Sequence, residues 1–132
     1  MHIPVDIRRF PWIKKLAADY AFQFSALAPF FSGDPSSPAS WTSAIAHAQR
    51  HPRRREELSA LLTNQLERRN APAGARDAAV RLRDPQTVAI VTGQQAGLFG
   101  GPLFTLYKGL TAAKLAAQMS REHGVPAVAV FW

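Results

Sequence analysis

The hydrophobic pattern of the chain changes at Val88, and this change constrains the fold more than any other feature. Val88–Thr92 is an unbroken, mostly β-branched run between a turn sequence and a glycine, which is typical of a strand buried on both faces. A second apolar run, Ala127–Trp132, follows a segment of helical spacing that begins at Pro102 and closes at Gly124. Strand, helix and strand in this order predict a right-handed crossover between parallel strands, and therefore an α/β fold.

The loop from Thr92 to Pro102, between the first strand and the helix, is the predicted ligand-binding segment. In parallel α/β sheets, ligands bind beyond the carboxyl ends of the strands, where loops lead into helix N-termini. Backbone N–H groups and the helix dipole favour an anion there, such as a phosphate or carboxylate, and two glutamine side chains can orient a polar substrate. The predicted substrate-binding residues are Thr92, Gly93, Gln94, Gln95, Gly97, Leu98, Phe99, Gly100, Gly101, Thr105 and Lys108.

No established nucleotide motif accounts for this loop. Its glycine spacing lacks the terminal Gly-Lys-Ser/Thr of a P-loop, and Gly-x-Gly-x-x-Gly never appears. The four histidines (His2, His47, His51 and His123) lack metal-ligand spacing, so we predict no metal site. The sequence pattern brings together neither a pair of carboxylates nor a Ser/His/Asp set, so it identifies no catalytic residues. A loop whose glycines serve only a sharp turn is the structural alternative.

The segment before residue 87 has helical patterns throughout, and we expect residues 1–86 to pack on a sheet domain that starts at residue 87. A helix with one buried face is predicted up to about Phe31, with its aromatic residues in the core. Shorter helices are predicted around Ala44, over 54–69 and over 75–82. The residues expected to face inward are Leu16, Tyr20, Phe24, Leu27, Ala44, Ile45, Ala48, Leu58, Leu61, Leu62 and Leu66, with Ser40 or Thr42 as a helix cap.

The helix after Pro102 is expected to bury one apolar stripe against the strands. This stripe consists of Leu103, Leu106, Tyr107, Leu110, Ala113 and Ala117, whereas Lys108, Gln118, Arg121 and Glu122 are expected to face water.

The net charge of +7 is concentrated away from the predicted loop. Between Arg50 and Arg83 there are nine arginines and four acidic residues. Such a run is typical of a solvated helix face, and a surface for RNA or another polyanion is the alternative. The basic cluster at residues 50–55 has no interleaved aromatic side chains, so it lacks the stacking partners of a single-strand platform. We therefore expect no nucleic-acid partner for the loop.

The chain is expected to be a cytoplasmic globular protein. It contains no cysteine, which fits a reducing compartment and excludes disulfides and a cysteine nucleophile within it. No apolar run approaches the roughly 18–20 residues of a membrane-spanning helix, so no membrane association is expected. The first residues, Met1–Asp6, lack the basic and apolar regions of a secretory signal.

The run Val-Thr-Gly-Gln-Gln-Ala-Gly-Leu-Phe-Gly-Gly-Pro-Leu-Phe-Thr-Leu-Tyr-Lys, residues 91–108, resembles the signature of the bacillithiol-biosynthesis cysteine-adding enzymes, the BshC family. The segment 124–132 is similar to the next element of that family, and the helical lead-in agrees in layout. Motif identity is specific only over residues 88–132. The resemblance implies a Rossmann-like core related to class I nucleotidyltransferases.

The resemblance also implies a function: a cysteine ligase that adds cysteine to glucosaminyl malate, completing a low-molecular-weight thiol. It implies that Gly93, Gln94, Gln95, Gly97, Gly100 and Gly101 line the substrate pocket. ATP or another nucleotide is the candidate cofactor, and homo-oligomerisation of the full-length protein is left open.

Members of the family are several times longer than 132 residues, and two parallel strands alone leave open edges. We therefore expect this chain to be the amino-terminal, truncated part of such an enzyme, with little activity alone. The alternatives are a small basic RNA- or polyanion-binding module and an inactive fragment.

Overall fold

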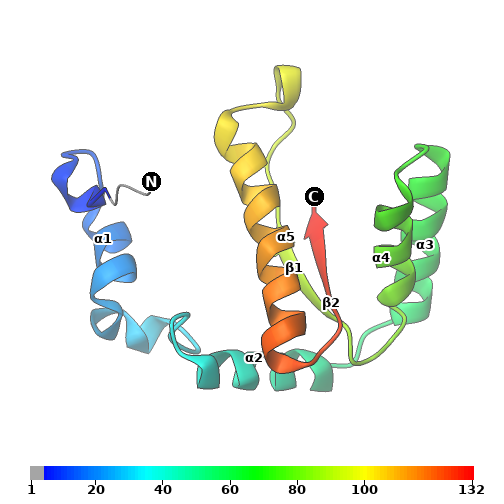
Figure 1. Ribbon diagram of the computed structural model, residues 1–132, viewed down its shortest axis with the longest axis horizontal. Helices are drawn as coiled ribbons and strands as arrows, with labels where there is room; N and C mark the ends of the chain where they lie inside the picture. The colour runs from blue at the N-terminus through cyan, green and yellow to red at the C-terminus, as the bar shows by residue number, and fades with distance from the viewer. Residues whose placement is uncertain (1–4) are drawn as a thin grey trace. The chain divides into compact units, whose positions relative to one another are not determined.

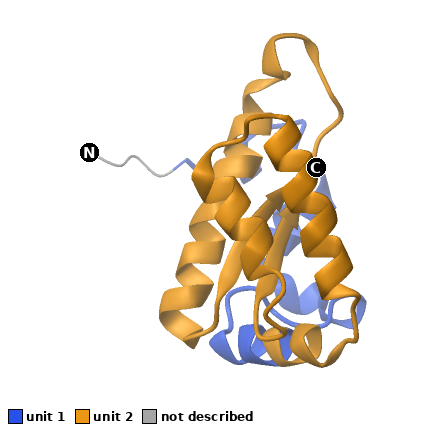
Figure 2. Cartoon of the chain, turned by 90° about the vertical axis from the view of Figure 1, so that its right-hand side faces the viewer, with its two compact units in different colours: residues 1–44 blue, residues 45–132 orange. Residues whose placement is uncertain are grey.

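The structure, a computed structural model, describes residues 5–132, and the chain divides into two compact units (Figure 2). The first unit comprises residues 1–44 and the second residues 45–132. Helix α2, Pro38–Arg50, contains the boundary between them. The sequence pattern predicted a different boundary, between a helical segment (1–86) and a sheet domain (87–132). The division into compact units does not test that boundary, which stays a prediction.

The first unit consists of short helical elements. They are the 3-10 turn η1 (Ile7–Arg9), helix α1 (Lys15–Phe22), the 3-10 turns η2 (Phe24–Ala26) and η3 (Ala28–Phe30), and the start of α2. Three rings from these elements and the chain after them, Tyr20, Phe24 and Phe31, lie with centroids 5.3 to 5.8 Å apart. These three rings contact one another, although Tyr20 and Phe31 stay exposed.

The predicted continuous helix face in the first unit is wrong. Helix α1 ends at Phe22, so the later apolar residues lie on 3-10 turns and not on the same stripe. Leu27 is buried, but Leu16 and Tyr20 are exposed. The aromatic residues are likewise not a closed core: Trp12 and Phe30 are among the exposed ones.

Helix α2 also begins earlier than predicted. It starts at Pro38, because proline is well suited to the first turn of a helix. Ser40 and Thr42 therefore lie inside the helix and do not cap it. Of the residues expected to face inward, Ile45 is buried and Ala48 is half-buried, whereas Ala44 is exposed.

Helices α3 (Arg55–Arg68) and α4 (Ala73–Arg81) form a packed pair in the second unit. At their contact the fully buried Ser59 hydroxyl donates to the Ala79 carbonyl oxygen at 2.7 Å. The predicted leucine stripe is therefore only half correct. Leu62 and Leu66 are half-buried, but Leu58 and Leu61 are exposed because the contact face is centred on Ser59.

Two strands, β1 (Val88–Thr92) and β2 (Ala127–Phe131), pair in parallel and in register, from Val88 opposite Ala127 to Thr92 opposite Phe131. The predicted α/β class and parallel pairing are confirmed. Helix α5 (Leu103–His123) packs along both strands, and α4 contacts β2 from the other side (Figure 1). The prediction that β1 is buried on both faces is wrong, since Ala89 and Val91 are exposed and Val91 has 60% of its surface accessible.

Helix α5, Leu103–His123, presents a different face to the sheet from the predicted one. Its buried residues are Ala112, Ala116 and Met119, whereas the expected stripe of Leu103, Leu106, Tyr107, Leu110, Ala113 and Ala117 is exposed. Small alanine side chains let the helix approach the strands closely, and Met119 fills the space beside them. The left-handed Gly124 (φ 65°) ends the helix as predicted.

Candidate functional site

The predicted loop leaves the sheet at the carboxyl ends of both strands. The backbone N–H of Trp132 donates to the Thr92 carbonyl oxygen at 3.1 Å, and that of Gln94 donates to the Trp132 carbonyl oxygen at 3.0 Å. The parallel pairing therefore extends past β1 and fixes the first residues of the loop. This is the edge where parallel α/β sheets bind ligands.

The middle of the loop folds into the 3-10 turn η4, Leu98–Gly100, before α5 begins. Gly100 and Gly101 have φ values of 87° and 79°, a region that glycine adopts without steric cost. Phe99 also lies in the left-handed region (φ 53°), and its side chain is fully exposed. A bulky residue held there is a local strain of the kind that clusters at functional segments.

Lys108 connects the helix to the start of the loop. Its Nζ donates to the Gly93 carbonyl oxygen at 2.5 Å and to Gln94 Oε1 at 3.1 Å. Gln94 Nε2 in turn donates to Gln95 Oε1 at 3.0 Å. Lys108 was predicted both to face water on the helix and to reach the loop. It is half-buried, because it reaches back along α5 toward the strand end. Four predicted site residues are thus brought together in one polar cluster.

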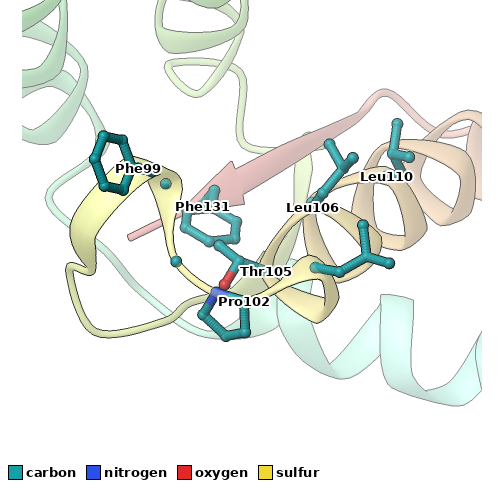
Figure 3. Close-up of a pocket in the computed structure, with 10 residues that line it drawn as sticks. Phe99, Pro102, Thr105, Leu106, Leu110 and Phe131 are labelled. Atoms are coloured by element: carbon teal, nitrogen blue, oxygen red, sulfur yellow. The ribbon is translucent and has the colours of Figure 1, made fainter.

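A second group of predicted residues lines an apolar cavity of about 610 Å³ beside η4 (Figure 3). Phe99, Gly100, Gly101 and Thr105 belong to it. The Thr105 Oγ1 atom is buried and has no hydrogen-bond partner within the described residues. The hydroxyls of Thr63 and Thr87 are likewise buried and unpaired among the described residues, but of the three only Thr105 lines this cavity, where a ligand could supply a partner.

The remaining predicted residues are less involved. Leu98 is exposed and Thr92 contributes its backbone carbonyl to strand pairing. Gly97 lies against Gly101, since a Cβ added at Gly97 would be 2.9 Å from the Gly101 Cα. Their role in binding stays a prediction.

Sequence reasoning missed several lining residues, namely Pro102, Leu103, Leu106, Gly109, Leu110 and Phe131. The leucines had been assigned to the buried stripe of α5, and Phe131 to the interior of a strand. The available signal was Gly109 inside a helix, which suggests a close neighbour; that neighbour is Phe131, although a Cβ at Gly109 would meet its ring at 3.7 Å, an ordinary contact.

The arginine-rich segment lies in α2, α3 and α4 and the turns beside them, and several of its cations have internal partners. Arg54 and Arg83 pair with Glu57 and Glu56. Two further guanidinium groups, those of Arg53 and Arg55, donate to backbone carbonyl oxygens. These four arginines therefore contribute to contacts within the chain.

Residues 5–132 contain neither a metal site nor a membrane-spanning helix. No group of three His, Cys, Asp or Glu side chains is placed to hold a metal ion there. His2 lies outside the described residues. Nor does that part of the chain contain a helix that is both long and apolar enough to cross a membrane.

Comparisons with known proteins agree with this architecture. The chain is 42% identical over 130 residues to the putative cysteine ligase BshC of Salinibacter ruber, an alignment that covers 98% of this chain and 23% of the relative. It is 36% identical over 118 residues to the protein of the same name from Halalkalibacterium halodurans, covering 89% of this chain and 22% of that one. The protein of that name from Solibacter usitatus is 38% identical over 122 residues, covering 92% and 22%.

The chain thus spans less than a quarter of the length of these relatives. Residues 3–132 also match the family model described as bacillithiol biosynthesis BshC, N-terminal Rossmann-like domain. The match extends over both units and includes the loop and the polar cluster at Lys108. On this evidence the chain belongs to the BshC family, as its N-terminal Rossmann-like domain.

Proposed function

We propose that this chain forms part of the substrate site of a cysteine ligase that adds cysteine to glucosaminyl malate in bacillithiol biosynthesis. The observation that carries the proposal is the cluster of Lys108, Gln94 and Gln95 at the carboxyl edge of the parallel strands. The relatives named putative cysteine ligase BshC contain a segment 36–42% identical to this chain. The first line of support concerns binding and the second concerns family membership, and neither identifies a catalytic residue.

The loop supplies the kind of contacts that hold a polar substrate in place. Gln94 and Gln95 carry amide groups, and the half-buried Lys108 carries a positive charge close to them. Cysteine and glucosaminyl malate both contain carboxylates, which such donors bind well. Positioning two substrates side by side is itself a large part of the catalysis of bond formation between them.

A carbon–nitrogen bond cannot form from an amine and a free carboxylate without activation of the carboxyl group. ATP or another nucleotide is the candidate activator, in a binding mode other than a P-loop because the chain lacks that motif. We place the reaction in the cytoplasm, where the cysteine and the thiol product stay reduced.

The polyanion-binding alternative rests on the exposed Arg50, Arg68, Arg69, Arg76 and Arg81, and it is weakened by the internal partners of the other four arginines of the segment. Arg54 and Arg83 are paired with carboxylates, and Arg53 and Arg55 donate to carbonyl groups. A surface devoted to phosphates would instead leave its guanidinium groups directed outward.

The test uses a chimera in which this chain replaces the matching N-terminal segment of the Salinibacter ruber relative. Cysteine and glucosaminyl malate are supplied with and without ATP, and the thiol product is detected by mass spectrometry. The chimera should form the product, and its Gln94→Ala/Gln95→Ala variant should lose about 10- to 100-fold in rate because the substrate is no longer positioned.

Gln118→Ala provides the matched control, because this glutamine lies near the carboxyl end of α5 and its amide donates to Glu122 Oε2. Its rate should equal that of the parent chimera. If the unmodified relative makes the product but a folded chimera does not, the proposed function of this chain is wrong.

A further inference from the structure

We propose that Lys108 is a positioning residue that fixes the direction of the Gln94–Gln95 amide pair, so that the loop offers N–H donors to an acceptor oxygen of its substrate. The identity of that substrate rests on the proposed function. The direction of the amide pair does not, since it follows from the hydrogen bonds of the chain itself.

The argument begins with the chemistry of lysine. An ammonium group has three donors and no acceptor, so any group that it contacts must present an acceptor. Lys108 Nζ contacts the Gly93 carbonyl oxygen and the Gln94 side chain. Gln94 must therefore direct its Oε1 toward Lys108. This assignment follows from the hydrogen-bond partners alone, because the reversed amide would direct its NH2 group at the ammonium, and both groups are donors.

The orientation of Gln94 determines that of its neighbour. With its oxygen directed toward Lys108, Gln94 turns its Nε2 group toward Gln95, and it donates to Gln95 Oε1 at 3.0 Å. The Nε2 group of Gln95 is then the free end of the chain of hydrogen bonds. Gln95 is exposed, and within residues 5–132 its Nε2 has no acceptor.

The charge of Lys108 acts in the same direction. Within residues 5–132 no carboxylate lies at salt-bridge distance from it. It is half-buried, with the Phe104 ring 5.8 Å from Nζ. A hydrogen-bonded cation polarises the amides in series, which strengthens the last donor. The site therefore favours an anionic acceptor, either a carboxylate or a phosphate, over a donor group.

A single substitution should reverse this direction. In Gln94→Glu the carboxylate still accepts from Lys108, but it has no N–H to offer to Gln95. Gln95 would then turn its own Nε2 toward Glu at 94 and present its oxygen outward. In Lys108→Met nothing selects either orientation, and both amides become free to rotate.

The first measurement needs no ligand. Hydrogen exchange of the glutamine side-chain amides is followed by ¹⁵N NMR in the 132-residue chain. The Gln94 amide should exchange more slowly than that of Gln95; Lys108→Met should make the two rates equal, and Gln94→Glu should slow the exchange of Gln95. Lys114→Met, an exposed lysine on the same helix, is the control and should change neither rate. Equal rates in the unmodified chain would overturn the positioning role.

The second measurement titrates L-malate and, separately, inorganic phosphate, and follows the same amide signals. Lys108→Met and Gln94→Glu should each weaken binding of the preferred anion about tenfold or more, the effect of losing one charge-assisted contact. Lys108→Arg should restore it to within about threefold, because a guanidinium also donates. Stronger binding of phosphate than malate would assign the site to a phosphate group and keep the proposal.

The two proposals can fail separately. If malate binds but the variants bind it equally well, the positioning role of Lys108 is wrong and the proposed function stands. If the exchange rates behave as expected but neither anion binds, Lys108 keeps its role in orienting the amides. The proposed substrate class, and the function that rests on it, would then be wrong.

Discussion

Gly93 lies directly against Trp132. A Cβ atom on Gly93 would stand 2.6 Å from the Trp132 carbonyl oxygen and 2.8 Å from its indole Nε1. The same carbonyl accepts the Gln94 N–H, so the two strand ends and the loop meet at one point. Glycine is required there by close approach of another backbone, and this contact sets the position from which Gln94 reaches Lys108.

Gly93→Ala should therefore destabilise the chain by about 1–3 kcal/mol, as overpacked sites commonly do. The neighbouring atoms include a backbone carbonyl that cannot move without disturbing β2. Gly74→Ala is the control: a Cβ at Gly74 meets nothing within 4 Å, and alanine should stabilise α4 by up to about 1 kcal/mol. Urea unfolding of both variants measures the difference, and equal stabilities would contradict the contact.

Thr105→Val tests the unpaired hydroxyl in the cavity. Valine has nearly the same shape, and the Oγ1 atom it removes is buried without a partner in the described residues. The variant should be as stable as the parent chain or more stable by about 1 kcal/mol, because an unsatisfied polar group is removed. Weaker substrate binding together with unchanged stability, measured by calorimetry, would identify the hydroxyl as a ligand contact. A clear loss of stability would show that the hydroxyl is already satisfied.

Arg55 holds three carbonyl groups around the turn that leads into β1. Its Nη1 lies 3.1 Å from each of the Leu82, Asp84 and Thr87 oxygens. Arg55→Lys should cost about 1–2 kcal/mol, since the lysine side chain is one bond shorter and does not bring its ammonium to the position that Nη1 occupies. Arg54→Lys should change stability by less than about 0.5 kcal/mol, because the pair that Arg54 forms with Glu57 is exposed. Thermal unfolding of the two variants tests the contrast.

Ser59→Ala should weaken the contact between α3 and α4. The Ser59 hydroxyl is fully buried and donates to Ala79, so its loss should cost about 1–2 kcal/mol. Ser43 is exposed on α2, and Ser43→Ala should change stability by no more than about 0.5 kcal/mol. If chemical denaturation gives the same midpoint for both, the buried hydrogen bond contributes nothing.

The orientation of α5 can be tested in a similar way. Met119 is 1% exposed, and Met119→Ala should cost about 2–5 kcal/mol through the lost contacts and the cavity left behind. Leu106 is 58% exposed, and Leu106→Ala should cost less than about 1 kcal/mol. A larger loss of stability at Leu106 than at Met119 would show that the leucine stripe predicted from the sequence is the buried face of α5.

Much of the second unit could be predicted from local signals. The β-branched run fixed β1 at its observed bounds, and the left-handed Gly124 ended α5 where the pattern placed it. These features depend on the steric preferences of single residues, which a sequence expresses directly. The glycine-rich loop with its paired glutamines was likewise recognisable as the candidate site.

The faces of the helices were not predictable in the same way. Leu106 and Leu110 have the stronger hydrophobic character, yet Ala112 and Ala116 face the strands. Leucines that fit a helical stripe bury themselves only if a surface of matching shape is present, whereas close approach to a sheet favours small side chains. Which stripe is buried is a property of the packed pair of elements and not of the helix alone.

The sequence by itself determined the parallel strand–helix–strand unit and the loop that carries the candidate site, because each depends on residues close together in the chain. Only the tertiary structure decided that Lys108 reaches Gly93 and Gln94, that Phe131 and Thr105 line one cavity, and that Gly93 meets Trp132. These contacts join residues 14 to 39 positions apart. Their geometry follows from how α5 and β2 return to the end of β1, which no local pattern specifies.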